Sequence, residues 1–383
     1  MNQKPKDTRR IVVKLGSNLF FTPEGDLALG RIASLIEDIA EARLSGLQII
    51  TVSSGAVALG SNALKMKPQS ALLAQKQAFA AVGQSRLMGI YEQGFAKFGL
   101  TAAQILLTEE DFSNRKRYLN LRNTLMTLLE MGVMPIINEN DTVSTSELEV
   151  TDRSASFSDN DKLSALVMSK LEAQLLVLLS DVDGLYTDNP HENPDAKRIP
   201  KVHEITPEIE ALAGRKSSRG RGGMASKLQA AEIAINSGGK AIIANGMTPG
   251  VLKRIFAGES EGTLFAGTSE ALSGKRRWIA FASSVAGRIH INAGAQEAIA
   301  RKNASLLFPG ITRIENEFEP GDVVAIIGPE GLEMARGIAN YSSADATKLI
   351  GRQSADIERL ASTRNYDAFV TRDNIAFTSK NHE

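Results

Sequence analysis

Short aliphatic runs alternate with longer amphipathic stretches between residues 11 and about 260. The runs are bounded by glycine and polar clusters, as is typical of buried strands in a parallel sheet. The predicted strands are residues 11–15, 47–52, 133–138, 175–180 and 241–244. Between the first two strands, apolar residues recur at helical spacing and predict a crossover helix over residues 27–45. The pattern predicts an α/β domain, with an open and mainly parallel sheet sandwiched by helices.

The hydrophobic pattern changes after residue 262. Glycine, serine and threonine dominate the next stretch, which predicts a linker over residues 263–275. Beyond it, short apolar runs at 289–291, 305–307 and 323–327 are separated by Pro-Gly and Gly-Pro pairs. They predict a second, smaller β-rich domain over residues 276–361, followed by a polar tail over 362–383. A first domain over residues 1–262 is consistent with a 383-residue chain, which exceeds what one core usually supports.

Composition narrows the possible classes of protein. Hydrophobic residues make up 43% of the chain and charged residues 23%, as in ordinary globular proteins. Lys plus Arg equals Asp plus Glu at 44 each, so no overall field favours a nucleic acid or a membrane surface. The absence of cysteine excludes disulfides, thiolate metal sites and a cysteine nucleophile. Residues 1–10 are polar and the longest aliphatic run, 175–179, is too short for a bilayer, so we expect a cytoplasmic protein without a membrane segment.

Polar or glycine-rich turns follow several predicted strands, and the carboxyl ends of parallel strands meet at one edge of a sheet. Lys14 and Gly16 end the first strand, where backbone N–H groups could approach a phosphate, although a single lysine is often only a solvated charge. Ser53 and Ser54 lead from the next strand into a helix and could bind an anion or only cap that helix.

Carboxylates and amides crowd two further segments, residues 138–141 and 158–161. Such groups could bind a substrate ammonium, organise lysines or help to hold magnesium-bound phosphate. An ordinary turn with a helix cap explains either segment alone. Residues 180–186 end another strand with two aspartates, which suits a nucleotide base or a simple turn.

A glycine-rich loop over residues 219–227 leads into a helical pattern. Glycines followed by Lys227 one turn inside a helix suit a nucleotide phosphate site, and a flexible linker is the alternative. Gly220, Gly222 and Ala225 also fit G-x-G-x-x-A, which leaves an NAD-dependent enzyme as a rival. A dinucleotide fingerprint should follow a strand, whereas residues 215–219 are polar loop sequence.

Taken in order, these segments resemble the amino acid kinase family. Residues 13–16 begin the match, and residues 52–56 resemble the family pattern V-[ST]-S-G-A. Further matches are AVGQSRL at 81–87, INEND at 137–141, the DNDxLSA-like segment at 158–165 and the GLYT-containing loop at 183–186. Residues 276–279 and later segments resemble a PUA domain, so the resemblance covers nearly the whole chain.

The resemblance implies ATP-dependent phosphorylation of the side-chain carboxylate of L-glutamate, the first step of proline synthesis. Another small carboxylate or carbamate substrate is the alternative within the family. The resemblance implies that Lys14 and Lys227 flank the transferred phosphoryl group and that Asp161 holds both lysines. It implies substrate binding by Ser54, Asp141 and Asn160, and Mg²⁺ bound through ATP phosphates without a protein metal site. The implied ATP-binding residues are Lys14, Ser180, Asp181, Arg221, Gly222, Gly223, Met224, Ala225, Ser226 and Lys227.

Three features depart from the family pattern: residues 142–158 are longer, Arg221 replaces a smaller residue, and Ser180 replaces threonine. The family also implies feedback inhibition by L-proline, a homo-oligomer and a functional link to glutamyl phosphate reductase. PUA domains often bind RNA, which raises an RNA-linked function as another rival. Residues 276–383 hold 13 Lys or Arg against 13 Asp or Glu, so no net charge favours RNA.

Overall fold

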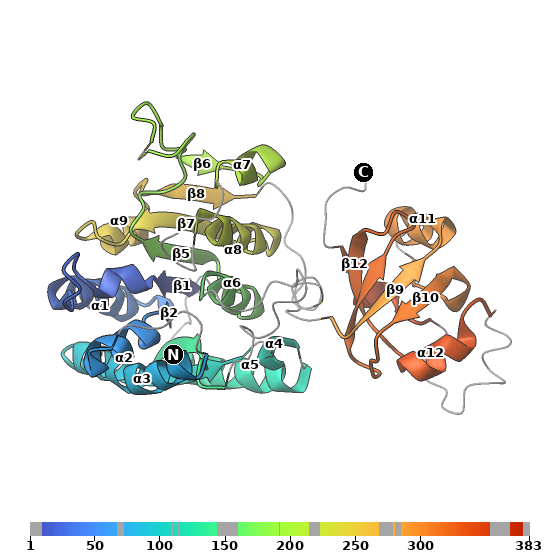
Figure 1. Ribbon diagram of the computed structural model, residues 1–383, viewed down its shortest axis with the longest axis horizontal. Coiled ribbons are helices and arrows are strands. Elements are labelled where there is room, and N and C mark those ends of the chain that lie inside the picture. The colour runs from blue at the N-terminus through green and yellow to red at the C-terminus, as the bar shows by residue number, and fades with distance from the viewer. Residues whose placement is uncertain are drawn as a thin grey trace, which may run out of the picture. The chain divides into compact units, whose positions relative to one another are not determined.

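The computed structural model describes residues 10–66, 73–108, 110–113, 115–143, 160–190, 192–213, 223–267, 279, 285–302, 304–352 and 368–377. The chain divides into two compact units (Figure 1). The first unit comprises Met1–Thr108 and Arg122–Ala271, and the second comprises Glu109–Leu121 and Leu272–Glu383.

The first unit is built on an eight-stranded sheet in the order β3-β4-β2-β1-β5-β7-β8-β6. Its strands are β1 (Arg10–Leu15), β2 (Gln48–Ser53), β3 (Ala102–Leu107), β4 (Met134–Glu139), β5 (Leu175–Ser180), β6 (Lys201–Val202), β7 (Lys240–Asn245) and β8 (Thr263–Ala266). Neighbouring strands pair in parallel, except that β8 is antiparallel to β7. The chain leaves β1 toward β2 on one side and later returns to β5 on the other. The topological switch point, where such sheets bind ligands, therefore lies at the carboxyl ends of β1 and β5.

Helices cover both faces of this sheet (Figure 1). One face packs against α1 (Leu29–Leu44), α3 (Leu73–Ala96) and α9 (Val251–Ala257), and the other against α6 (Asn160–Lys170) and α8 (Met224–Asn236). The first unit also contains α2 (Ala56–Leu64) and α7 (Pro207–Ala211). Helix α4 (Glu110–Ser113) and the start of α5 (Arg115–Glu130) belong to the second unit, and the rest of α5 belongs to the first. Because side chains alternate along a strand, Val13 and Leu15 enter the core beneath α1 whereas Lys14 faces α6.

The second unit contains a five-stranded sheet in the order β10-β9-β11-β12-β13. Its elements are β9 (Gly287–Ile291), α11 (Ala293–Lys302), β10 (Ile311–Glu315), β11 (Val323–Ile327), β12 (Glu333–Ile338), α12 (Ser343–Leu349) and β13 (Ile375–Phe377). Strand β11 is buried along its whole length and lies at the centre of the sheet. Phe308, Phe318 and Phe369 pack edge to face beside it in one apolar core.

The predicted fold class is confirmed: a mainly parallel sheet with helices on both faces and a separate smaller β-rich domain. The five strands predicted in the first domain occur within one residue of their predicted ends. Three strands were not predicted, because β3 is rich in alanine and partly exposed and because β6 and β8 are short. Strand β8 lies within the range expected to be a linker. In the second domain, residues 305–307 form no strand, and Leu306 makes only an isolated bridge to Val370.

Candidate active site

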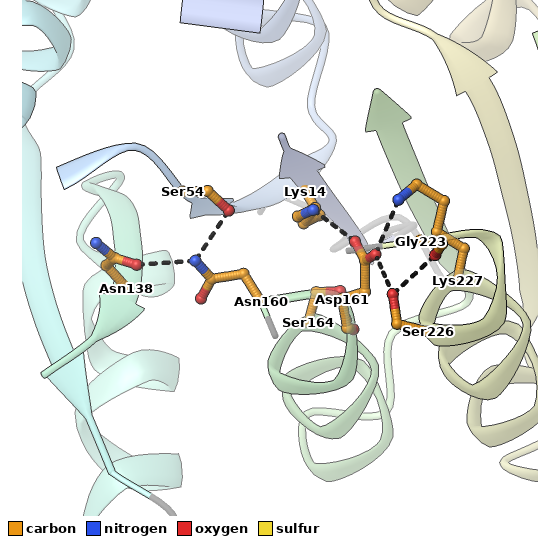
Figure 2. A network of polar contacts seen from close by, with 9 residues as sticks. All are labelled: Lys14, Ser54, Asn138, Asn160, Asp161, Ser164, Gly223, Ser226 and Lys227. Atoms are coloured by element: carbon orange, nitrogen blue, oxygen red, sulfur yellow. Dashed lines mark hydrogen bonds and ion pairs between the residues drawn. The ribbon is translucent and has the colours of Figure 1, made fainter. Parts of the chain in front are cut away.

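Two lysines share one aspartate at the carboxyl ends of the central strands (Figure 2). Lys14 Nζ, on β1, lies 2.6 Å from Asp161 Oδ1, and Lys227 Nζ, on α8, lies 3.1 Å from Asp161 Oδ2. Lys14 and Lys227 are far apart in the sequence, and the fold brings their ammonium groups to opposite oxygens of one carboxylate. The cluster predicted from the resemblance is therefore assembled in the structure.

This cluster of three charged side chains is buried. Asp161 is fully buried and the two lysine side chains are at most 6% exposed. Burial raises the pKa of the Asp161 carboxyl, but the ammonium groups of Lys14 and Lys227 outweigh burial and hold that pKa below its ordinary value. Two ammonium groups held together at the ends of the central strands suit an anionic ligand such as phosphate.

The first turn of α8 adds hydrogen-bond donors beside the lysines. Ser226 Oγ donates to Asp161 Oδ2 at 3.1 Å or to Gly223 O at 3.0 Å, which ties this turn to the cluster. Gly223 precedes α8 in an extended conformation, and the backbone N–H groups of the first helical turn have no partner within the helix. A helix start of this kind, next to two lysines, can bind a phosphate group.

Amide and hydroxyl side chains form a second arm of the site (Figure 2). Asn160 Nδ2 donates to Ser54 Oγ at 2.9 Å and to Asn138 Oδ1 at 3.1 Å. These three residues come from the start of α6, the end of β2 and the end of β4. The arm is polar and has no net charge, which suits a zwitterionic or hydroxylated ligand.

The start of α6 joins the two arms. Asn160 and Asp161 are consecutive residues in its first turn, so their side chains diverge by about 100° around the helix. Asn160 reaches Ser54, and Asp161 reaches the two lysines. A ligand bound by the amide arm therefore lies next to the ammonium groups of the lysine cluster.

A third group of polar residues follows β5 and β7. Ser180 is buried at the end of β5, and its hydroxyl has no hydrogen-bond partner among the described residues. Asp181 is exposed and accepts from Asn18 Nδ2 at 2.8 Å. Gly16 N donates to Leu179 O at 3.0 Å, and a Cβ on Gly16 would lie only 3.1 Å from that oxygen. Glycine therefore allows β1 and β5 to approach closely beside Lys14.

Comparison with family models identifies the family to which the chain belongs. The model of the amino acid kinase family matches residues 9–245, and the model of the PUA domain matches residues 287–361. The chain belongs to the amino acid kinase family. The family match spans both lysines, Asp161 and the amide arm.

Several curated relatives of this amino acid kinase family member are glutamate 5-kinases. The chain is 46% identical to that of Trichlorobacter lovleyi, with 97% of each chain covered, and 45% identical to that of Geobacter sp. (strain M21), with 97% of this chain and 98% of the relative covered. It is 43% identical to that of Moorella thermoacetica, with 96% of each chain covered. Among solved structures, an isopentenyl phosphate kinase aligns with 18% identity and a TM-score of 0.47 over 67% of this chain and all of the other.

The structure places most of the residues that the family resemblance singles out. Met224 and Ala225 lie in the first turn of α8 with Ser226 and Lys227, and Asp141 lies in the turn after β4. Arg221 and Gly222 lie outside the described residues, as does nearly all of the long segment 142–158.

Sequence reasoning missed Asn138 as a site residue. The segment 138–141 stands out in the sequence, but the resemblance assigns only Asp141 to the substrate, although Asn138 is the residue that contacts Asn160. The signal was available, because Asn138 is the polar residue at the end of a buried strand.

The described residues include no cluster of His, Cys, Asp or Glu that could hold a metal ion, and both oxygens of Asp161 face lysines. No helix in the part of the chain that the structure describes is both long and apolar enough to cross a membrane.

Proposed function

We propose that this chain transfers the γ-phosphoryl group of ATP to the side-chain carboxylate of L-glutamate. The products are L-glutamyl 5-phosphate and ADP, in the first step of proline biosynthesis. The relatives that are similar over nearly the whole chain are glutamate 5-kinases, and the family is one of kinases. The observation that carries the proposal is the buried Lys14–Asp161–Lys227 cluster beside a neutral polar arm.

The charge of this cluster matches the chemistry of the reaction. The attacking group is a carboxylate, which is ionised near neutral pH and needs no general base. A glutamate oxygen attacks the γ-phosphorus, the bond to the β,γ-bridging oxygen breaks, and ADP leaves with those electrons. The two reactants are both anions and repel each other, so catalysis depends on alignment and on positive charge at the transferred group. In this proposal Lys14 and Lys227 supply that charge, and Asp161 holds the two ammonium groups apart.

The remaining residues divide between the two substrates. Ser54, Asn160 and Asp141 bind L-glutamate in this proposal, and Ser180, Asp181 and residues 221–227 bind ATP. Mg²⁺ enters with ATP and is held through phosphate oxygens, where it neutralises part of their charge.

The test is an assay of ADP release that depends on glutamate, with hydroxylamine to trap the acyl phosphate as a hydroxamate. Aspartate and N-acetylglutamate are run in parallel, because one shortens the side chain and the other removes the α-ammonium charge. We expect ADP release and hydroxamate formation in a ratio near one with glutamate, and little of either with the analogues. ADP release without hydroxamate, or equal rates with N-acetylglutamate, would overturn the proposal.

The other predictions from the family resemblance concern the behaviour of the protein in solution. Feedback inhibition by L-proline, a homo-oligomer, a link to glutamyl phosphate reductase and a cytoplasmic location stay predictions. RNA binding by the PUA domain is not favoured, and the comparisons support a kinase over the NAD-dependent rival. An RNA affinity that falls steeply with salt would count against this view of the second domain.

A further inference from the structure

A chain of side-chain amides leads away from the glutamate arm, which is the arm of the site formed by Ser54, Asn138 and Asn160. Asn138 Nδ2 donates to Gln84 Oε1 on α3 at 2.9 Å, and Gln84 Nε2 donates to Gln104 Oε1 on β3 at 3.0 Å. Asn138 is 2% exposed, Gln84 is half-buried and Gln104 is exposed. The chain therefore connects the protein surface with Asn160 through three amides.

A backbone group sets the direction of the hydrogen bonds at Asn138. The N–H of Glu139 donates to Asn138 Oδ1 at 2.9 Å, and a backbone N–H cannot accept. An amide carries its acceptor and its donors on different atoms, so Asn138 must direct its Nδ2 toward Gln84. The same Oδ1 accepts from Asn160 Nδ2 at 3.1 Å.

This polarity determines what the site offers to a substrate. Asn160 uses its Nδ2 for Asn138 and Ser54, and its Oδ1 is buried without a hydrogen-bond partner among the described residues. Ser54 Oγ accepts from Asn160, so its own hydroxyl hydrogen remains available to donate. A free acceptor and a free donor next to each other complement the α-ammonium and α-carboxylate groups of an amino acid.

We propose that Gln84 is a positioning residue that sets the selectivity of the site for the substrate's α-ammonium group. Gln84 touches no substrate and acts through Asn138, because it accepts from the Nδ2 atom of that buried amide. Without this acceptor a buried donor is left unsatisfied, and the Asn138 amide turns toward another partner. Asn160 then loses an acceptor for its Nδ2 and no longer keeps its Oδ1 directed at the substrate. The inference rests on the proposed function, since it assigns glutamate to this arm.

Helix α3 holds Gln84 at a fixed place. Gly83, the preceding residue, packs so closely on α2 that a Cβ atom there would lie 1.7 Å from Ala56 O. Two turns further along α3, the buried Tyr91 hydroxyl donates to Ser53 Oγ at 2.8 Å, directly before Ser54. Helix α3 therefore contacts Asn138 and the residue before Ser54, so it supports the glutamate arm at two points. A positioning role requires such a placement.

Three variants test this proposal. Gln84→Met keeps the length of the side chain and removes its acceptor, whereas Gln84→Glu keeps an acceptor for Asn138 Nδ2. Gln93→Met makes the same change at an exposed position of α3 and serves as the control. The measurements are kcat, the KM for glutamate, the KM for ATP and the Ki of glutarate, which is glutamate without its α-ammonium group. Circular dichroism and thermal unfolding check that each variant folds.

We expect Gln84→Met to raise the KM for glutamate about tenfold, as for a buried donor left unpaired, while kcat and the KM for ATP change by less than about twofold. The ratio of the glutarate Ki to the glutamate KM should fall at least about fivefold, because the lost interaction is the one with the ammonium group. Gln84→Glu and Gln93→Met should keep the KM for glutamate and this ratio within about twofold of the wild type, since neither removes the acceptor for Asn138 Nδ2.

Three results would overturn the positioning role. The first is an unchanged KM for glutamate in Gln84→Met, and the second is equal damage in Gln84→Glu. The third is a raised KM with an unchanged selectivity ratio, which indicates a purely structural effect. If Gln84→Met does not fold, Gln84→Ala is judged by the same criteria. A wild-type chain that forms no acyl phosphate from glutamate refutes the proposed function and this inference together. An active wild type, with an unchanged KM for glutamate in Gln84→Met, refutes this inference alone.

Discussion

Replacing Asp161 with asparagine removes one charge from the centre of the site and nearly preserves the shape of the side chain. Asp161 is fully buried and is the counter-ion of both Lys14 and Lys227. In the variant, the two buried ammonium groups lose their shared carboxylate, and an amide N–H₂ group faces one of them. Removing one partner of a buried ion pair typically costs about 3–5 kcal/mol. For a unit of this size each kcal/mol lowers the unfolding temperature by roughly 2–4 °C, so we expect a loss of roughly 6–20 °C.

Activity should fall as well as stability. The lysines of Asp161→Asn are no longer held at a fixed separation, so the transition state loses preorganised charge and turnover falls at least about a hundredfold. Calorimetry follows the unfolding transition of the first unit, and the hydroxamate assay follows turnover. Asp195→Asn is the control, because it removes the same charge from an exposed turn. The control should leave both values near those of the wild type.

The pH dependence of the difference in stability between the wild type and Asp161→Asn identifies the cause of that difference. The lysines hold the pKa of Asp161 below its ordinary value despite burial, so the folded state binds this proton less readily than the unfolded chain does. The carboxylate's contribution to stability is therefore present above the unfolded pKa of about 3.9 and is lost as the pH falls through the folded value. The difference between wild type and variant should be constant from about pH 6 to 8 and shrink below about pH 4. An unchanged unfolding temperature at pH 7, or a difference that grows in acid, would refute this reasoning.

Lys14→Ala and Lys227→Ala should each lower turnover about a hundredfold or more with the fold intact, because each removes a positive charge that faces the transferred phosphoryl group. Near-normal turnover in either variant would contradict that role. Asn160→Ala should chiefly raise the glutamate KM, and a change confined to the ATP KM would show that the arm is wrongly assigned. Gly83→Ala should lower stability by about 1–3 kcal/mol, since the clash with Ala56 O outweighs the gain of about 1 kcal/mol in helix propensity. Urea unfolding measures this loss, and a stabilised variant would disprove the close packing of α2 on α3.

The parallel sheet could be predicted because its central strands are buried on both faces and appear as continuous aliphatic runs. Residues 175–180 show this clearly, since five of the six are buried. The edge strand β3 could not be found in this way, because partial exposure breaks the run with alanine and glutamine. Hydrophobic pattern therefore reports a strand's burial, and it fails where a strand lies at the edge or is short.

The site shows a similar division. Lys14 and Lys227 could be singled out because each stands beside glycine at the end or start of an element, which is a local signal. Gln84 lies within the matched segment 81–87, but its contact with Asn138 left no local signal, because it lies in the middle of a helix and its partner comes 54 residues later. Helix α3, which carries Gln84, contacts β3, and β3 pairs with β4, which carries Asn138. This tertiary packing brings the two residues together. Lys14 and Lys227 therefore carry a local signal in the sequence, whereas the contact of Gln84 with Asn138 depends on tertiary packing.

The start of α6 explains why binding and transfer can be separated by mutation. The sequence pattern predicts that this helix begins near residue 162, which leaves Asn160 and Asp161 in a turn of undefined direction. The helix begins instead at Asn160, so both residues take helical geometry and their side chains point about 100° apart. The positive end of the helix dipole also favours the negative charge of Asp161 in the first turn. Because backbone geometry rather than a shared side-chain contact links the two residues, Asn160 can be changed without displacing Asp161. A variant at residue 160 should therefore weaken glutamate binding and leave the lysine cluster assembled.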